Sequence, residues 1–272
     1  MNGQTRQIAM VSGAASGLGL ALARALAARG DAVMLADVDE PALADVLAEL
    51  RHLPGARIAA RRCDVSRSAD VVALRDATLD EFGAVHLVFN NAGVAPMGAA
   101  WESGEADWER ALGVNLWGVI HGVRAFVPVL IEQDAGRIIN TASVAGLVSP
   151  RGMAAYSATK HAVVALTETL RHDLAARGSK VRCSVVCPAY FPSAIGDGPA
   201  PEHETPEQQR MRAMLRAAVA AGRLSADEVA ARVLAGIAAD NFYILTHPRI
   251  LGAVRQRMED ILDGGEPRDP MD

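Results

Sequence analysis

Short apolar runs alternate with longer segments in which apolar residues recur every three or four positions. Strands that alternate with helices pair in parallel and carry helices on both faces of the sheet. The pattern therefore predicts an α/β, doubly wound, three-layer fold with a mostly parallel seven-stranded sheet. The predicted strands are residues 8–12, 32–36, 57–63, 85–89, 136–141, 180–187 and 242–246. One predicted helix follows the first strand and ends at about residue 29. The others span about 41–50, 68–82, 105–132, 152–177, 225–239 and 250–262.

Polar and turn residues mark several helix ends. Gly30 is placed to close the first helix and Pro41 to begin the second. Ser68 is expected to cap the helix over 68–82, and Ser225 with Glu228 forms a capping-box pattern.

The periodicity lapses over about 189–222, where glycines and prolines precede an arginine-, methionine- and alanine-rich helical stretch. A long irregular segment inside a compact domain is usually a lid or a binding loop. We expect a substrate lid here and a loose tail over 264–272. With no internal repeat and no convincing linker, residues 1–272 are expected to form a single domain.

Composition narrows the class of protein. The chain has 272 residues, of which 50% are hydrophobic and 4% aromatic, and a formal net charge of −5. That charge argues against a general binder of nucleic acid or of anionic membranes. We find no leader at the N-terminus and no uninterrupted apolar stretch near the length of a membrane span. A cytoplasmic protein that needs neither nucleic acid nor membrane is expected.

Cysteines and histidines give no metal signature. Cys63, Cys183 and Cys187 make an odd number without a close pair, and they are expected to be reduced and buried. The seven histidines are dispersed, so no metal site is predicted.

A glycine-rich turn joins the first strand to the first helix. Gly13, Gly17 and Gly19 would let the backbone approach a pyrophosphate and aim the helix N-terminus at its charge. The spacing GxxxGxG differs from the common GxGxxG. A bare glycine match is weak, and the rest of the chain must support it.

Asp37 ends the second predicted strand, about where a carboxylate would accept from a ribose hydroxyl. That carboxylate would repel a 2′-phosphate, and no lysine or arginine lies in Ala14-Ala15-Ser16 or directly after Asp37. The sequence thus favours NAD over NADP. The alternative is that Asp37 is only a strand-end turn residue.

Tyr156 and Lys160 stand four positions apart in a predicted helix and therefore share one face. A nearby ammonium favours the phenolate and lowers the pKa of a tyrosine. Such a tyrosine can donate and accept a proton near neutral pH. Taken alone, the pair is common in surface helices.

The ordered set of motifs resembles the short-chain dehydrogenase/reductase family, in its compact, single-domain branch with a Rossmann fold. The resemblance covers residues 8–193 and includes the glycine turn, Asp64, Asn90-Asn91-Ala92-Gly93, Asn115, Ser143 and Tyr156-x-x-x-Lys160.

The resemblance implies a role for each catalytic residue. Tyr156 would be the general acid/base, Lys160 would lower its pKa and hold the nicotinamide ribose, and Ser143 would bind the substrate oxygen. Asn115 would hold a water that links Lys160 to solvent. Separately, Ser143 could merely end a strand, and Asn115 could merely pack on the sheet.

The resemblance also implies an NAD site, with Asp64 accepting from the adenine amino group. The expected cofactor-binding residues are Gly13, Ser16, Gly17, Leu18, Gly19, Asp37, Asp64, Val65, Asn91, Ala92, Gly93, Tyr156, Lys160, Pro188 and Ser193. One departure concerns Ala189, because the family usually has glycine after the proline. Ser193 stands where the family usually has threonine, and its hydroxyl can still donate to the pyrophosphate or the carboxamide.

The expected substrate pocket is largely apolar and is bounded by residues 94–101, 144–153 and 190–215. It favours a hydrophobic, and by analogy an aromatic, secondary alcohol or its ketone. The apolar residues offered by these stretches are Met97, Val144, Leu147, Val148, Met153, Tyr190, Phe191, Ile195, Met211, Met214 and Leu215.

Two other functions compete with this reading: a non-catalytic dinucleotide-binding regulator or scaffold, and a methyltransferase that would leave Tyr156 and Lys160 idle. By resemblance, the long helices over 105–132 and 152–177 are expected to pair between subunits in a homodimer or homotetramer.

Overall fold

A parallel sheet forms the centre of the structure, a computed structural model that describes residues 6–196 and 205–271. The strand order is β3-β2-β1-β4-β5-β6-β7, and every neighbouring pair is parallel. The order reverses between β1 and β4, so the carboxyl ends of these strands border a crevice. The strands are β1 Ile8–Ser12, β2 Ala32–Asp37, β3 Arg57–Arg62, β4 Leu87–Asn90, β5 Arg137–Thr141, β6 Arg182–Val186 and β7 Tyr243–Ile244.

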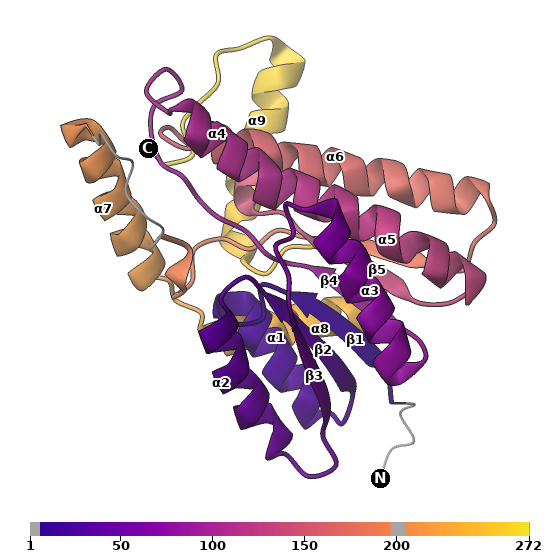
Figure 1. Cartoon of the computed structure of the whole chain (residues 1–272). Coiled ribbons are helices and arrows are strands. Elements are labelled where there is room, and N and C mark those ends of the chain that lie inside the picture. The colour runs from indigo at the N-terminus through magenta and orange to yellow at the C-terminus, as the bar shows by residue number, and fades with distance from the viewer. Residues whose placement is uncertain (1–5, 197–204, 272) are drawn as a thin grey trace.

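Helices cover both faces of the sheet (Figure 1). One layer holds α1, α2 and α8, and the other holds α3, α5 and α6, as the two main core clusters show. The α-helices are α1 Gly17–Ala28, α2 Glu40–Arg51, α3 Ser68–Phe82, α4 Glu105–Ala111, α5 Gly118–Glu132, α6 Ala154–Ala176, α7 Pro206–Ala220, α8 Ala226–Ala238 and α9 Leu251–Asp263. A π-helix, Leu112–Trp117, joins α4 to α5, and short 3₁₀ turns span Val144–Gly146, Ala194–Gly196 and Pro248–Ile250.

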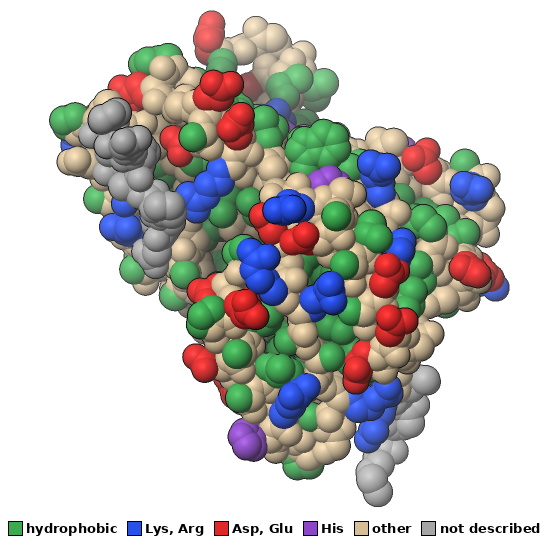
Figure 2. Space-filling model, viewed as in Figure 1, with side chains coloured by type: hydrophobic (Ala, Val, Ile, Leu, Met, Phe, Trp, Pro, Cys, Tyr) green, Lys and Arg blue, Asp and Glu red, His purple; other side chains and the backbone are tan. Residues whose placement is uncertain are grey.

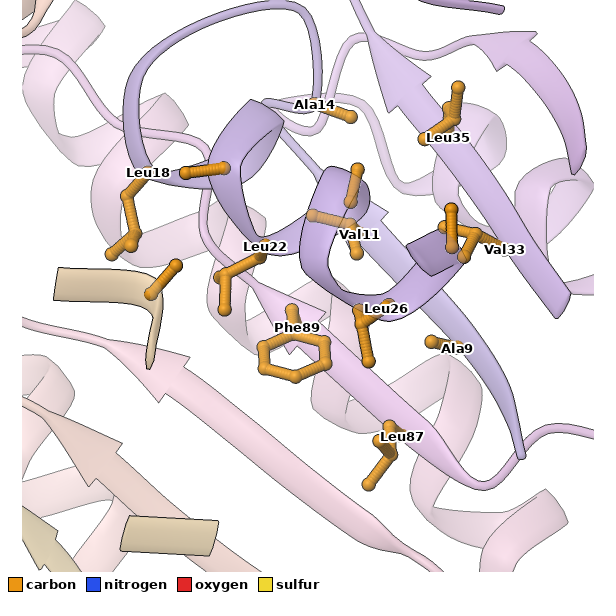
Figure 3. Packing of buried hydrophobic residues seen from close by; sticks show 14 of the residues in the cluster. Ala9, Val11, Ala14, Leu18, Leu22, Leu26, Val33, Leu35, Leu87 and Phe89 are labelled. Atoms are coloured by element: carbon orange, nitrogen blue, oxygen red, sulfur yellow. The ribbon is translucent and has the colours of Figure 1, made fainter. Parts of the chain in front are cut away.

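Alternate residues of the central strands face opposite cores. Ala9 and Val11 of β1 pack in the cluster beneath α1, whereas Met10 packs on the other face. Figure 3 shows Leu22 and Leu26 of α1 lying over Phe89 of β4. Both faces of these strands are buried, which explains why they are continuous apolar runs in the sequence. The predicted three-layer fold is confirmed.

Several boundaries differ from those expected. Arg67, not Ser68, is the N-cap residue of α3, and Ser68 is its first helical residue. The expected helix over 105–132 is interrupted by the π-helix, and the last strand shortens to two residues. The capping box of Ser225 and Glu228 is present as predicted.

The stretch Glu105–Glu132 is, among the described residues, long and apolar enough by length and composition to cross a membrane. Half of its most apolar window is buried inside the protein. Its buried residues include Phe126 and Leu130, which belong to the core on the sheet. The same length and composition are found in core helices, so this stretch is weak support for a membrane span.

The segment expected to be a lid contains α7, which begins with a capping box of Thr205 and Gln208. Gln208 is buried and donates to the backbone carbonyl of Glu102 at 3.2 Å, which ties α7 to the loop before α4. Prolines 199 and 201 of the expected lid lie outside the described residues.

Two residues of the C-terminal tail, the segment that we expected to be loose, form ion pairs. Arg268 pairs with Asp260 of α9, and Asp269 pairs with Arg151 beside the start of α6 at 3.3 Å.

Figure 2 shows acidic and basic side chains interspersed with hydrophobic ones over the viewed face.

Candidate active site

The glycine turn follows β1 and brings three backbone segments together. Gly13 has φ +66°, and a methyl group placed on it would lie 2.9 Å from Cα of Ala92. A methyl group on Gly19 would collide with the carbonyl of Gly13. Only glycine fits both positions. The first turn of α1 therefore lies open at its N-terminus, with no acidic residue in it, as an anion site requires.

Asp37 faces this turn from the end of β2. One carboxylate oxygen accepts from the backbone N–H of Ala15 at 3.0 Å, and the other accepts from Asp39 at 3.1 Å. These bonds fix the carboxylate and leave further lone pairs for a ligand hydroxyl.

Asp64 lies beyond the end of β3 and is oriented by its own turn. Its carboxylate accepts from the backbone N–H of Ser66 at 3.0 Å and from the Ser66 hydroxyl at 2.7 Å. The next carbonyl, of Val65, lies 2.9 Å from Nδ1 of His121. Asp64 and Val65 line the same cavity as Asp37.

The segment after β4 is tied to β1. The Asn91 backbone N–H donates to the Ser12 hydroxyl at 2.9 Å, and the Asn91 amide donates to the Ser12 carbonyl at 3.0 Å. Behind it, the Asn90 amide donates to Asn140, whose amide donates to Thr167. This buried chain of hydrogen bonds connects β4, β5 and α6, so Ala92 and Gly93 have a rigid support.

Ser193 lies beside the glycine turn. A methyl group on Gly17 would lie 3.4 Å from its Cβ. Among the described residues other than glycine, positive φ is confined to Asp134 and Asp240. Ala189 thus adopts ordinary backbone geometry, and the missing glycine imposes no strain there.

Asn115 sits in the π-helix and is completely buried. Its amide oxygen accepts from the Val94 backbone N–H at 2.8 Å, and its nitrogen donates to the Val94 carbonyl and to the Thr159 hydroxyl. A methyl group on Gly93 would lie 3.4 Å from the Asn115 oxygen and 3.5 Å from Nζ of Lys160. The amide and the ammonium therefore face the same point.

Tyr156 and Lys160 share the inner face of α6. Both side chains are buried, and Nζ of Lys160 lies 5.6 Å from the centre of the Tyr156 ring. The ammonium donates to the carbonyl of Thr141 at 2.9 Å. Ser143 follows β5, and its hydroxyl accepts from the backbone N–H of Ala145 at 3.1 Å.

Burial shifts the pKa of both α6 residues away from what the sequence suggested. It raises the pKa of Tyr156 to about 12, although hydrogen bonding to Ser143 opposes the rise. It lowers the pKa of Lys160 to about 8. In the protein by itself Tyr156 is therefore a neutral phenol, and Lys160 is not among the causes that lower its pKa.

One continuous cavity of about 300 Å³ joins these parts. The glycine turn and Asp37 lie at one end, and Ser143, Tyr156 and Lys160 line the other. This arrangement fits a dinucleotide, because the turn leaves the helix N-terminus open and Asp37 retains acceptor capacity. Of the expected cofactor residues and catalytic residues, those that line the cavity are Gly13, Ser16, Gly17, Leu18, Asp37, Asp64, Val65, Asn91, Ala92, Gly93, Ser143, Tyr156, Lys160, Pro188 and Ser193.

An apolar wall lies beside Tyr156. Met153, Leu215 and Val219 pack with it in one buried cluster, to which α7 contributes Leu215 and Val219. Of the apolar residues expected around the substrate, those that line the cavity are Val144, Met153, Tyr190, Phe191, Ile195 and Leu215. Met97 and Met211 pack behind the wall, Leu147 and Val148 are not part of it, and Met214 is exposed.

The groups that the sequence reading missed include Val219 and the carbonyl of Thr141. Val219 stands four positions after Leu215 on α7, so the helical period could have identified it. The Thr141 carbonyl that holds Lys160 is a backbone group, and nothing in the residue pattern marks it.

Known proteins share this arrangement. A family model described as short chain dehydrogenase matches residues 7–201. A 1-deoxy-11-beta-hydroxypentalenate dehydrogenase of Streptomyces exfoliatus is 37% identical over 96% of this chain and 90% of its own. The cyclohexanol dehydrogenase of Acinetobacter sp. (strain SE19) is 31% identical over 88% of this chain and 90% of its own.

A solved structure is similar throughout. The short chain dehydrogenase/reductase from Burkholderia phymatum, in complex with NAD, has a TM-score of 0.94 and 48% sequence identity, and the match covers 97% of both chains. Since the family model matches well over half of the chain and these relatives match it nearly end to end, the chain belongs to the short-chain dehydrogenase/reductase family.

Proposed function

We propose that this protein is an NAD-dependent oxidoreductase that interconverts a hydrophobic secondary alcohol and its ketone by hydride transfer. One observation carries the proposal: Ser143, Tyr156 and Lys160 meet at one end of a cavity whose other end holds the glycine turn and Asp37. A group that takes up or gives a hydride would therefore lie next to a proton donor and acceptor.

The cofactor preference follows from the charges at the far end of the cavity. Asp37 is held there by two backbone N–H groups, and Lys160, at the opposite end, is the one lysine or arginine among the described lining residues. A 2′-phosphate would meet a carboxylate and no cation, so NAD is favoured over NADP. The relative from Burkholderia phymatum in complex with NAD supports the same choice.

Each catalytic residue has a role that its contacts permit. Tyr156 takes the hydroxyl proton on oxidation and returns it on reduction, and Ser143 donates a hydrogen bond to the substrate oxygen. A bound nicotinamide supplies the hydride acceptor or donor and, when oxidised, a positive charge. Nζ of Lys160 lies 5.6 Å from the centre of the phenol ring, and its charge, which does not lower the pKa of Tyr156 in the protein by itself, would favour the phenolate in the complex with the cofactor.

Asn115 would hold the water that connects Lys160 to solvent. Its side-chain amide is already engaged by Val94 and Thr159. We therefore assign the water to the remaining lone pair of the amide oxygen or to the backbone of the π-helix.

The apolar wall beside Tyr156 indicates the class of substrate. Met153, Ile195, Leu215 and Val219 offer aliphatic or thioether surface, while Tyr190 adds a phenol. Such a wall binds a cyclic or aromatic carbon skeleton better than a phosphorylated sugar. The names of the relatives, a cyclohexanol dehydrogenase and a hydroxypentalenate dehydrogenase, support alicyclic alcohols.

We extend the proposal to the whole chain. Residues 1–272 act as a single Rossmann-fold domain in which about 189–222 form the substrate lid. The buried free thiols of Cys63, Cys183 and Cys187 suit a reducing cytoplasm. The partially exposed Trp117, next to α5, suits a subunit interface in a homodimer or homotetramer.

The test is turnover of NAD and NADP across a panel of cyclic, aromatic and linear secondary alcohols. We expect NAD-linked oxidation that favours the cyclic and aromatic members, and loss of at least about a thousandfold in kcat for Tyr156→Phe. Undiminished turnover by Tyr156→Phe would contradict the assignment. NADH binding without turnover of any alcohol would instead favour a non-catalytic dinucleotide-binding regulator.

A further inference from the structure

One peptide group links the catalytic serine to a histidine from the C-terminal segment. The carbonyl of Pro188 accepts from the Val144 backbone N–H at 2.9 Å and from the Ser143 hydroxyl at the longer distance of 3.4 Å. The N–H of the same peptide, on Ala189, donates to Nδ1 of His247 at 3.2 Å. Opposite ends of one peptide dipole are thus held by Ser143 with Val144 and by His247.

His247 is itself anchored by its neighbours. It follows β7, and the hydroxyl of the buried Thr246 lies 2.8 Å from Nδ1. Arg232 of α8 donates to the carbonyl of Thr246 at 2.6 Å. The imidazole is therefore delivered to Ala189 by a fixed segment rather than by a free loop.

The contacts select one state of the ring. Because a backbone N–H can only donate, Nδ1 must be an acceptor, so the proton of the neutral ring is on Nε2. Nε2 is buried and has no hydrogen-bond partner among the described residues. A second proton, on Nδ1, would face the N–H of Ala189.

We propose that His247 is a positioning residue, which holds the Pro188–Ala189 peptide so that Ser143 and the turn carrying Tyr190 keep their catalytic geometry. The inference rests on the proposed function, because it assumes that Ser143 binds the substrate oxygen. It deepens that function by assigning a role to a residue far from the catalytic set in sequence.

The position of Ala189 explains why such a partner is needed. A peptide polarised at its N–H becomes a better acceptor at its carbonyl, since linked hydrogen bonds strengthen each other. The carbonyl of Pro188 fixes Val144 and, through it, the backbone of Ser143. Losing the acceptor at Nδ1 would leave the N–H of Ala189 unpaired and free the peptide to rotate.

Protonation of His247 should have the same effect as removing it. Burial lowers the pKa of this imidazole, the positive charge of Arg232 lowers it further, and the polar backbone of Tyr190 opposes both. Thr246 contributes only a neutral hydroxyl. The rate should therefore fall at a pH below the ordinary histidine range, where Nδ1 gains a proton.

The experiment compares His247→Asn with His247→Phe in the full-length protein. Asparagine keeps an acceptor near the position of Nδ1 and cannot be protonated there, whereas phenylalanine fills the space without an acceptor. We expect His247→Phe to lower kcat/KM for the preferred alcohol at least about tenfold and His247→Asn to stay within about threefold of the wild type. Replacing the exposed His52 by asparagine is the matched control and should change neither the rate nor its pH profile.

The pH profile separates positioning from a general structural role. The loss of rate at acid pH should be present in the wild type and absent in His247→Asn. Equal kcat/KM for wild type and His247→Phe, or equal damage in both variants, would overturn the inference. If His247→Phe does not fold, the inference is overturned when kcat/KM of the wild type and of His247→Asn falls identically at acid pH.

Failure of the proposed function would look different. In that case Ser143→Ala and Tyr156→Phe would retain turnover. The dissociation constant of NADH, measured by fluorescence, would still test the peptide in the His247 variants. It should rise severalfold in His247→Phe and stay unchanged in His247→Asn, because Pro188 and Ala189 line the cofactor cavity.

Discussion

Lys160 shows what the site costs at the scale of a single residue. Lys160 is 2% exposed, and within the part of the chain that the structure describes its ammonium has one hydrogen bond, to the Thr141 carbonyl. Burial of a charge with so few partners destabilises the fold, and the lowered pKa of Lys160 reports this. The presence of Lys160 is therefore better accounted for by the proposed reaction than by stability.

Lys160→Met should therefore stabilise the cofactor-free protein at neutral pH by about 1–3 kcal/mol while abolishing turnover. Urea denaturation measures the first effect. The pKa of Lys160 falls from 10.5 to about 8 on folding, so between these values the unfolded chain binds more protons. The free energy of unfolding should then rise with pH above about 8 in the wild type.

In Lys160→Met the free energy of unfolding should not rise with pH above about 8. At higher pH, ionisation of Tyr156 lowers the free energy of unfolding in both proteins. The pKa of Tyr156 rises from 10.0 to about 12 on folding, so its contribution is lost only as the pH increases through that range. A variant that is less stable than the wild type at pH 7 would contradict this account of Lys160.

Asp37 gives a second prediction for a single residue. Asp37→Asn keeps an acceptor for the backbone of Ala15 but removes the charge that repels a 2′-phosphate. We expect the ratio of the NADPH and NADH dissociation constants to fall at least about tenfold. Asp39→Ser is the control, because Asp39 caps α2 with its side chain and lies outside the lining of the cavity. An unchanged ratio in Asp37→Asn would remove Asp37 from cofactor selection.

Residue chemistry was the part that the sequence predicted best. Tyr156 and Lys160 lie together because a helix places positions four apart on one face. Glycine is needed at position 13 because the chain turns there with positive φ. The state of Tyr156 could not be predicted, because desolvation depends on residues from several elements packed around it. His247 was missed for the same reason, since its partner Ala189 lies far away in the chain.

At the scale of elements, α7 of the proposed lid packs against Gly152, just before the start of α6. Gly152 has φ +73°, and a methyl group there would lie 2.7 Å from Sδ of Met211 on α7. The backbone N–H of Gly98 donates to the carbonyl of Gly152 at 2.9 Å, so three segments around the pocket meet at this glycine.

Gly152→Ala should displace α7 and raise the KM for the alcohol about fivefold or more, with little change in the NADH dissociation constant. Gly178→Ala is the control for backbone strain, because Gly178 has φ +65° and nothing within 4 Å of an added methyl group. Met211→Ala in addition should restore part of the lost affinity. Equal kinetics for Gly152→Ala and the wild type would show that α7 does not form the substrate pocket.

Element boundaries were harder to predict than the elements themselves. Ser68 is of a residue type that often caps helices, but α3 begins at Ser68 itself, and Arg67 is its N-cap residue. The carboxylate of Asp70, in the first turn of α3, accepts from the backbone N–H of Asp64. The π-helix at Asn115 was not predicted, because no residue type marks such a turn and the whole stretch Glu105–Glu132 is apolar enough to resemble one continuous helix.

At the scale of the whole molecule, large apolar side chains remain exposed on the outer helices. Trp117 is 48% exposed and Leu112 37% exposed on the long stretch that contacts α6. Exposed apolar surface beside long helices is typical of subunit interfaces.

We therefore expect a homodimer or homotetramer in light scattering, and a smaller assembly for Trp117→Glu. Trp101→Glu is the control, since Trp101 is 86% exposed on a loop before α4. A monomeric wild-type protein would contradict the proposed assembly. The fold of the chain predicts no stoichiometry, because the sequence pattern marks buried faces without saying what covers the others.

Hydride transfer assisted by Tyr156 can be followed with an isotope label on the substrate. A secondary cyclic alcohol deuterated at its carbinol carbon is incubated with NAD and the protein, and the recovered cofactor is analysed by mass spectrometry. The account predicts one deuterium per reduced cofactor with the wild type and almost none with Tyr156→Phe over the same time. Equal deuterium transfer by the two proteins, or reduced cofactor without deuterium, would contradict it.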